Sequence, residues 1–325
     1  MLLNIKCIDV GTNYCPCYLA EIGNCLVCSH LNGKGCGDCN WQGICIMNDF
    51  YWNGKRSAEG RTIIRPEEVS KKLIADNLLL LSAQIPSHKV KDFVHPGTFV
   101  FIKNDSFPDF YDVPTSVMDV DEKKHILHFA IQIVGPKTKA LLKEEKKITI
   151  RGPYWNGIYG IEHIKTLENG YVLIITRGIC QASALLLIKK LINNDNKVKV
   201  YIDPGSLGRI FIGDSLKELA ITAIKTDITK KEKLNEIKSD IENQPFDLIY
   251  SGGGDLQHLI IFKIIKETKK EVPLIASNNN QIYCGEGICG SCVAENSKGT
   301  HRERIYLCKA QFDYTTYVQR RGYNG

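Results

Sequence analysis

Hydrophobic and polar positions between residues 61 and 154 form short segments rather than long amphipathic repeats. The segments are apolar or alternating, and turn signals such as Pro96-Gly97 and Gly152-Pro153 separate them. Short runs bounded by glycine and proline are typical of strands. We expect strands over residues 78–85, 98–103, 126–134 and 148–151. Their spacing predicts a small antiparallel barrel.

From about Tyr171 the pattern changes to strands that alternate with helices. An apolar strand over 171–176, a turn at Gly178, a helix over 181–193 and a strand over 197–202 form the beginning of a βαβ unit. A charged stretch at 225–243 predicts a further helix. Beyond it we expect a strand over 246–250, a glycine turn, a helix over 255–268 and a strand over 273–276. This order predicts a Rossmann-like parallel sheet with flanking helices.

Composition is that of a globular protein with an unusual number of cysteines. Hydrophobic residues make up 43% and charged residues 24% of the 325 residues, which excludes a disordered chain. The net charge is +6, with lysines scattered among acidic residues, so nucleic-acid binding is not expected. No apolar run is long enough to span a bilayer, and the first ten residues lack the layout of a signal peptide. We therefore expect a cytoplasmic protein.

The thirteen cysteines fall into two groups, one before residue 46 and one after residue 283, with Cys180 between them. In a chain without an export signal, closely spaced cysteines indicate metal ligands or redox groups more than disulfides. Cys180 follows an apolar strand, and we expect it to be a buried thiol.

The tail group has the more specific spacing. Cys284, Cys289 and Cys292, with Cys308 after fifteen intervening residues, follow the C-x4-C-x2-C…C pattern of a plant-type [2Fe-2S] cluster. The glycines between them leave room for backbone amides to approach the sulfides of such a cluster. The alternatives for these thiols are a structural zinc site and a disulfide.

The spacing of the N-terminal cysteines identifies the bound metal less decisively. Its closely spaced cysteines are candidate metal ligands, and Cys7 is a more distant candidate. Iron–sulfur clusters and zinc both accept C-x2-C pairs, so a second iron–sulfur cluster, a zinc site and unligated thiols all remain open. Because the region has little hydrophobic periodicity, we expect bound metal to supply part of its stability. The candidate ligands are Cys15, Cys17, Cys25, Cys28, Cys36, Cys39 and Cys45.

Short motifs between the two cysteine groups occur in the order found in the ferredoxin-reductase-like family. Residues 96–99 (Pro-Gly-Thr-Phe) are similar to its P-G-Q-F motif, and residues 113–117 resemble its flavin motif R-P-x-S. Residues 135–138 resemble its G-x-G-T turn and residues 152–157 its G-P-L-G-N-G loop. Within the family, residues 61–313 most closely resemble the iron–sulfur electron-transfer subunit of dihydroorotate dehydrogenase and its sulfide dehydrogenase and transhydrogenase relatives.

The resemblance implies an FAD site in the barrel and a nicotinamide-nucleotide site in the parallel sheet. Two positions depart from the family pattern: Val113 stands where arginine is usual, and the first nucleotide turn keeps only Gly178 of its usual glycines. The cofactor-binding residues implied are Val113, Pro114, Thr115, Ser116, Ile131, Gln132, Ile133, Lys137, Thr138, Gly178, Gly252 and Gly253.

We therefore predict a multi-domain β plus α/β protein in four parts. They are a Cys-rich metal-binding extension (1–60), an FAD-binding barrel (61–160), an NAD(P)-binding-like α/β domain (161–277) and a [2Fe-2S] subdomain (278–325). The predicted function is that of an electron-transfer flavoprotein oxidoreductase. It would pass electrons between NADH or NADPH, FAD and the [2Fe-2S] cluster, to or from a protein partner such as a catalytic subunit or a ferredoxin.

No catalytic side chain is expected, because the cofactors carry the reaction. The alternative is a non-enzymatic, zinc-binding interaction module with a degenerate nucleotide-binding domain.

Overall fold

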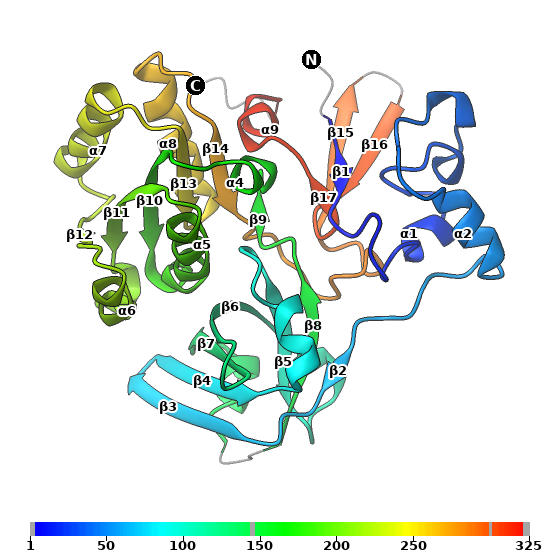
Figure 1. Cartoon of the computed structure of the whole chain (residues 1–325), viewed down its shortest axis with the longest axis horizontal. Helices are drawn as coiled ribbons and strands as arrows, with labels where there is room; N and C mark the ends of the chain where they lie inside the picture. Colours follow the sequence, from blue (N-terminus) through cyan, green and yellow to red (C-terminus); the bar gives the residue numbers. More distant parts are fainter. Residues whose placement is uncertain (1–3, 144–146, 299–300, 321–325) are drawn as a thin grey trace.

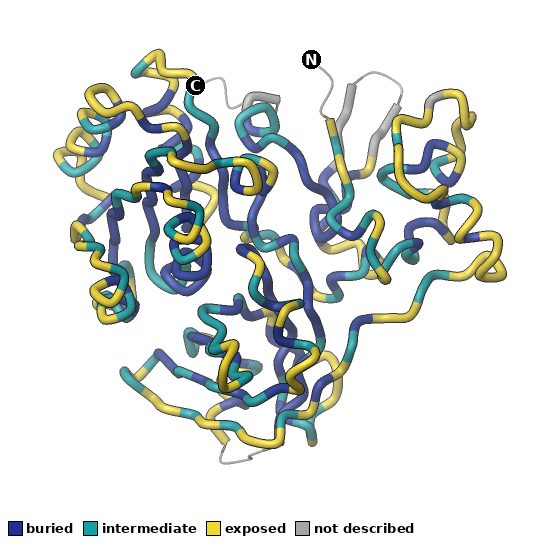
Figure 2. Tube along the Cα trace, viewed as in Figure 1, coloured by how far each residue is buried: buried dark blue, intermediate teal, exposed yellow. Residues whose placement is uncertain are grey.

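Two sheets form most of the structure, and a Cys-rich region lies beside them (Figure 1). The computed structural model describes residues 4–143, 147–298 and 301–320. In Figure 1 the antiparallel barrel lies at the bottom, the parallel sheet at the upper left and the N-terminal region at the upper right. Figure 2 shows that the chain is mostly buried along the parallel sheet and largely exposed around the N-terminal helices.

The barrel is a seven-stranded antiparallel sheet in the order β2-β8-β5-β6-β7-β4-β3. Alternate side chains of its strands form the core. In β4, Leu79, Leu81 and Ala83 are buried while Ser82 and Gln84 are partly exposed. This period of two is the pattern of a sheet with one buried face. The strands are β2 (Ile63–Ile64), β3 (Val69–Ala75), β4 (Leu78–Gln84), β5 (Phe99–Asn104), β6 (Val113–Asp121), β7 (Ile126–Gln132) and β8 (Ile148–Tyr154). The helix α3 (Pro136–Ala140) and the 3-10 turns η3 (Ser87–Asp92) and η4 (Asp109–Tyr111) connect them.

The second sheet has the order β12-β11-β10-β13-β14-β9, and only β9 runs antiparallel to its neighbour. Its strands are β9 (Ile158–Tyr159), β10 (Tyr171–Arg177), β11 (Lys197–Asp203), β12 (Ile224–Lys225), β13 (Leu248–Gly252) and β14 (Leu274–Ser277). Its helices are α4 (Glu162–Lys165), α5 (Gln181–Asn193), α6 (Gly213–Glu218), α7 (Lys231–Asn243) and α8 (Asp255–Glu267), with the turns η5 (Gly178–Cys180) and η6 (Gly205–Leu207).

Helices cover both faces of this sheet, so its central strands are buried on both sides. Val172 and Ile174 of β10 share a hydrophobic cluster with side chains of α5, whereas Leu173 and Ile175 share one with side chains of α8. Each such fully buried aliphatic side chain contributes about 1.5–3 kcal/mol. Burial of both faces explains why this strand is a continuous apolar run in the sequence.

The two ends of the described chain meet in a separate two-stranded sheet of β1 (Lys6–Cys7) and β17 (Ala310–Gln311). The strands are antiparallel, with Cys7 opposite Ala310. The amide of Ile8 donates to the carbonyl of Lys309 at 2.9 Å and extends the pairing. The tail also contains a hairpin of β15 (Val293–Lys298) and β16 (His301–Tyr306), and the helix α9 (Tyr314–Arg320).

The rest of the N-terminal region has a small core of its own. Side chains from α1 (Tyr18–Glu21), η1 (His30–Asn32) and α2 (Ile46–Trp52) pack together, and η2 (Cys36–Asp38) lies at the surface. The buried members of this core are Ala20, Cys28, Leu31, Ile46 and Phe50. So small a core agrees with the weak hydrophobic periodicity of this region.

Most of the predicted elements are present within two or three residues of their expected ends. The helix expected over 225–243 begins only at Lys231, because Asp227 accepts hydrogen bonds from the amide and hydroxyl of Thr229 and forms a turn there. Of the strands in the two sheets, the long strands β3 and β6 and the two-residue strands β2, β9 and β12 were not predicted. β3 carries Lys71 and Lys72 in a largely exposed edge strand, which weakens its hydrophobic alternation.

Candidate functional site

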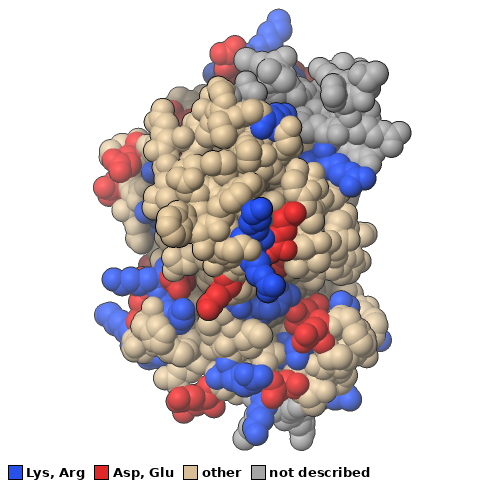
Figure 3. All heavy atoms as spheres, turned by 90° about the vertical axis from the view of Figure 1, so that its right-hand side faces the viewer, with Lys and Arg blue, Asp and Glu red and all other residues tan. Residues whose placement is uncertain are grey.

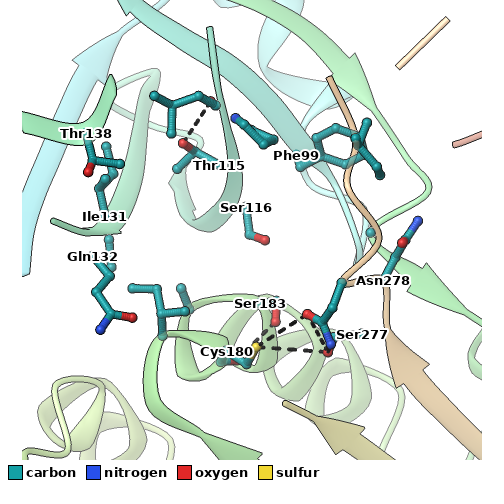
Figure 4. Close-up of a pocket in the computed structure, with 18 of the residues that line it drawn as sticks. Phe99, Thr115, Ser116, Ile131, Gln132, Thr138, Cys180, Ser183, Ser277 and Asn278 are labelled. Atoms are coloured by element: carbon teal, nitrogen blue, oxygen red, sulfur yellow. Dashed lines mark hydrogen bonds between the residues drawn. The ribbon is translucent and has the colours of Figure 1, made fainter. Parts of the chain in front are cut away.

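A cavity of about 360 Å³ lies between the barrel and the parallel sheet (Figure 4). One wall is formed by β5, β6 and β7 of the barrel. The opposite wall is formed by the turn between β10 and α5 and by the loop that follows β14. Seven of the predicted cofactor-binding residues line it: Val113, Pro114, Thr115, Ser116, Ile131, Gln132 and Thr138.

The barrel wall combines an apolar surface with a few polar groups. Phe99 and Ile131 supply the apolar surface, and the hydroxyl of Ser116 points into the space between the walls (Figure 4). At one end, the Thr138 hydroxyl accepts hydrogen bonds from the amides of Val134 and Gly135, at 3.0 and 3.1 Å, and so holds the turn. Apolar walls with few polar groups are typical of cofactor sites. The volume is within the range of small-molecule and cofactor pockets.

The remaining predicted cofactor-binding residues lie beside the cavity and do not line it. Ile133 is partly buried against the barrel core, and the Lys137 ammonium lies 3.5 Å from the carbonyl oxygen of Asp112. Gly178 precedes the lining residue Ile179 and has a φ of +55°. Gly252 and Gly253 lie at the end of β13. The roles assigned to these residues remain predictions.

The wall on the parallel-sheet side contains residues that sequence analysis did not assign to a site. They are Cys180 and the run Asn278-Asn279-Asn280 after β14. The expectation that Cys180 is buried is wrong, because its side chain is partly exposed at the cavity wall. Burial of most of the group raises the pKa of its thiol to about 11, so the sulfur is protonated at neutral pH. Three polar residues directly after a buried parallel strand could have indicated this wall, since ligands bind at the carboxyl ends of such strands.

A histidine is buried close to the same wall. The His258 ring lies 2.8 Å from the hydroxyl of Ser251 through Nδ1 and 3.1 Å from the carbonyl of Ser277 through Nε2. Burial lowers the pKa of His258 to about 4, so the ring is neutral at physiological pH. The neutral ring bridges the ends of β13 and β14, where the glycine turn at 252–254 begins.

The tail cysteines are arranged as two pairs. The Cys284 and Cys289 thiols lie beside each other, as do the Cys292 and Cys308 thiols. The neighbouring Cys308 thiol lowers the pKa of Cys292 to about 6. Backbone amides of Glu286 and Cys289 also donate to the sulfur of Cys284, at 3.3 and 3.5 Å. Such amide donors stabilise thiolate sulfur.

Three glycines shape the loop at 284–292, called the tail loop below, which carries Cys284, Cys289 and Cys292. Gly285, Gly287 and Gly290 have φ values of +73°, +77° and +72°, which other residues rarely adopt. A Cβ atom on Gly285 would lie 2.6 Å from the Tyr154 ring, so a larger residue does not fit there. The loop therefore packs directly against the barrel.

In the described part of the chain, no three Cys, His, Asp or Glu side chains are grouped so that they could hold a metal ion. The [2Fe-2S] cluster at Cys284, Cys289, Cys292 and Cys308 stays a prediction.

The tail loop is also connected to the wall of the cavity. Ile282 lines the cavity, and Cys284 follows two residues later. The Arg151 guanidinium donates to the carbonyl of Cys284 at 3.1 Å and forms an ion pair with Asp112, at 2.7 Å, directly before β6. Arg151, which sequence analysis did not single out, thus joins the flavin-motif strand to the cysteine loop.

The N-terminal cysteines occupy two different environments. Cys15, Cys17 and Cys25 line a small cavity together with Cys7. Cys28 is buried next to them, and its amide donates to the sulfur of Cys25 at 3.3 Å. The predicted ligands Cys36, Cys39 and Cys45 are exposed.

A buried group of charges lies between the N-terminal region and the tail loop. The Lys309 ammonium lies 2.6 Å from Asp9 and 2.9 Å from Glu286, and Arg61 lies 2.5 Å from Asp9. Although burial opposes ionisation, the charges of Lys309 and Arg61 lower the pKa of Asp9. Arg61 also stacks on Tyr14, with 3.7 Å between the guanidinium carbon and the ring centroid. These contacts hold the N-terminal region against both the barrel and the tail.

The outer face of the N-terminal side carries few charges over much of its area (Figure 3). Exposed hydrophobic side chains in the N-terminal region include Ile22, Ile44, Tyr51 and Trp52. Within the described residues, no helix has the length and apolar character needed to cross a membrane.

The barrel followed by the parallel sheet is the ferredoxin-reductase-like fold. The structure of an NADH-dependent reduced ferredoxin-NADP oxidoreductase matches with a TM-score of 0.60 and 21% identity, over 78% of this chain and 92% of that one. The ferredoxin reductase of carbazole 1,9a-dioxygenase matches with a TM-score of 0.51 and 15% identity, over 66% and 69% of the two chains. The expected barrel and parallel-sheet architecture is confirmed. No protein-family model matches the sequence.

Several characterised sequences are similar to a large part of this chain. The electron transfer subunit of dihydroorotate dehydrogenase B (NAD(+)) from Caldanaerobacter subterraneus subsp. tengcongensis is 25% identical, over 65% of this chain and 82% of its own. The same subunit from Clostridium acetobutylicum is 26% identical over 64% and 81%, and that from Clostridium perfringens 25% identical over 72% and 93%. The expected resemblance to these electron-transfer subunits is confirmed.

Proposed function

We propose that this protein is an electron-transfer flavoprotein oxidoreductase. It passes electrons between NADH or NADPH, FAD and a [2Fe-2S] cluster, to or from a protein partner. The observation that supports this most is the continuity of the interdomain cavity with the tail loop. Ile282 at the cavity wall and Cys284 at the first thiol pair are two residues apart, and Arg151 bonds to the loop from the barrel.

The barrel residues are suited to holding FAD. Thr115 and Ser116 bring hydroxyls to the cavity, and Thr138 holds a turn of amides at its end. The usual arginine is replaced by Val113, and Lys137 is a cation beside this motif, within 3.5 Å of the Asp112 carbonyl. FAD, when bound, supplies the change from two-electron hydride chemistry to single-electron transfer. No side-chain acid or base is needed for that chemistry.

A nicotinamide nucleotide would approach from the parallel-sheet side of the cavity. Gly178 keeps the first turn open, because no atom lies within 4 Å of the position that a Cβ would take. The Arg177 guanidinium forms an ion pair with Asp203 at 3.3 Å, so in this arrangement its charge is already paired with a carboxylate and not with a phosphate group. Gly252 and Gly253 provide the second turn.

The tail thiols would hold the [2Fe-2S] cluster through Cys284, Cys289, Cys292 and Cys308. The partner would be a catalytic subunit, as in the dihydroorotate dehydrogenase relatives, or a ferredoxin, and the site of action the cytoplasm. In this assignment the parts of the chain keep the predicted boundaries, with the cluster subdomain at 278–325.

The test is the cofactor content and redox response of the full chain purified without oxygen. We expect flavin, iron and acid-labile sulfide, with visible absorption that NADH or NADPH bleaches. In the Cys289→Ser variant the tail cluster should be lost while flavin remains. A colourless zinc protein would instead support the non-enzymatic interaction module. A coloured protein that neither nucleotide reduces would indicate a subunit that needs its partner.

A further inference from the structure

We propose that Cys7, Cys15, Cys17 and Cys25 hold a second iron–sulfur cluster, next to the tail cysteines. This ligand set differs from the one that sequence spacing predicts. It includes Cys7. It leaves out Cys28, which is buried but does not line the cavity, and the exposed Cys36, Cys39 and Cys45. The site itself is independent of the proposed function, whereas its role as an electron relay rests on that function.

Backbone amides lie close to the four sulfur atoms. The amide of Cys28 donates to the sulfur of Cys25 at 3.3 Å. The amides two residues ahead lie beside the sulfur atoms of Cys7 and Cys17. An amide two residues ahead is also the donor to Cys284 in the tail loop, at 3.3 Å. Buried free thiols pack as small hydrophobic groups and do not need such donors, whereas thiolate ligands do.

The surroundings of the four thiols suit a cluster that must be shielded from water. Apart from Asp9, Tyr14 and the thiols, the cavity is lined by aliphatic side chains and one proline. Four thiols around one such cavity match the number of thiolate ligands of an iron–sulfur cluster.

The strand pairing at the two ends of the described chain, and a shared hydrophobic cluster, connect this cavity to the region of the tail thiols. The pairing of β1 with β17 places Cys7 opposite Ala310, two residues after Cys308. Cys17 packs in the same hydrophobic cluster as Cys292 and Cys308. Between the two groups of thiols, Lys309 contacts Asp9 and Glu286, each of which lies two residues after a cysteine.

In Figure 1 the N-terminal helices α1 and α2 lie on the far side of β15, β16 and β17 from the parallel sheet. Clusters held by the two groups of thiols would supply one-electron transfer: the N-terminal cluster would be reduced as the tail cluster is reoxidised, with no bond formed or broken. A one-electron carrier protein would then reoxidise the N-terminal cluster.

The test compares single variants of the full chain, purified without oxygen, by iron and sulfide content and by electron paramagnetic resonance after dithionite reduction. The wild type should contain about two irons for the tail and about two or four more, for a second [2Fe-2S] or a [4Fe-4S] cluster. Cys7→Ser should lose the additional iron and its signal and keep the tail signal. Cys45→Ser, the control with an exposed thiol in the same region, should keep both.

A second variant distinguishes loss of the N-terminal cluster from misfolding of β1. Because Cys7 belongs to β1, Cys15→Ser, outside that strand, should show the same selective loss. Cys289→Ser should show the converse, loss of the tail signal with the additional iron kept, which separates failure of this proposal from failure of the proposed function. The proposal is overturned if the wild type carries only tail iron, or zinc in place of the additional iron. It is also overturned if Cys45→Ser loses as much iron as Cys7→Ser.

Discussion

The tail thiols and the N-terminal thiols are positioned in different ways. In the tail, one loop with three glycines of positive φ carries three of the four cysteines, and the fourth follows the hairpin of β15 and β16. At the N-terminus, Cys7 lies in β1, Cys15 and Cys17 precede α1, and Cys25 follows it. The first arrangement is made by local chain shape. The second depends on β17 and Lys309, about 300 residues away in the chain.

The largest predicted effect removes the buried cation between the two regions. Lys309→Met leaves the carboxylate of Glu286 without its lysine and weakens the pairing of Asp9, so we expect a loss of about 3–5 kcal/mol in the free energy of unfolding. Denaturant titration of the full chain measures it. The control, Lys6→Met, removes the exposed pair with Glu162 at 2.6 Å and should cost less than about 1 kcal/mol. Equal costs for the two variants would show that the buried charges do not join the regions.

A smaller effect is expected where the tail loop touches the N-terminal region. A Cβ on Gly287 would lie 2.8 Å from the Leu19 side chain of α1, and its φ is +77°. Gly287→Ala should therefore cost about 2–3 kcal/mol through overpacking and backbone strain. Gly23 has a φ of +68° with no atom within 4 Å of its Cβ position, so Gly23→Ala should cost about 1 kcal/mol. The difference between the two unfolding free energies measures the contact itself, and a difference near zero would contradict it.

The smallest predicted effect is a pH dependence of the contacts with α4. Burial opposes ionisation of Asp313, but hydrogen bonds from His163 and Thr316 outweigh it and lower its pKa to about 2, from 3.8. The ionised carboxylate therefore stabilises the fold above pH 3.8, and this contribution is lost as the pH falls toward 2. Because the side chain is 39% exposed, we expect about 1 kcal/mol at most.

The check is the unfolding free energy of the wild type and Asp313→Asn measured between pH 2 and pH 5. The variant should lack this part of the pH dependence. The pair of Lys6 and Glu162 connects β1 to the same helix and serves as the comparison, because both of its side chains are more than half exposed. If Asp313→Asn follows the wild-type curve throughout, the carboxylate does not anchor the tail to α4.

Much of the fold could be predicted because the local pattern of hydrophobic residues shows which positions are buried. The helix α5 has the bounds predicted for it, Gln181–Asn193, since an apolar run at 184–188 forms its centre and asparagine follows its last apolar residue. The continuous apolar run of β10 likewise indicated a strand with two buried faces. The edge strand β3 could not be predicted in this way, because one of its faces is solvated and Lys71 and Lys72 interrupt its pattern.

The residues of the candidate sites also differ in whether local sequence marks them. Thr115, Ser116 and Thr138 could be assigned to one cavity because short motifs mark them, although the chain folds back between them. Cys180 and Asn279 could not be assigned, since they meet only when the parallel strands align their carboxyl ends. Cys7 was placed at a distance from the other thiols because its position follows from pairing between the two ends of the chain.

That pairing has a consequence for how the molecule is made. In the described chain β1 has β17 as its strand partner, and the ribosome synthesises β17 about 300 residues after Asp9. The first strand therefore stays unpaired until β17 has been synthesised. Insertion of a cluster at the proposed N-terminal site would have to follow that step, so shorter translation products would leave their early cysteines without this strand pairing.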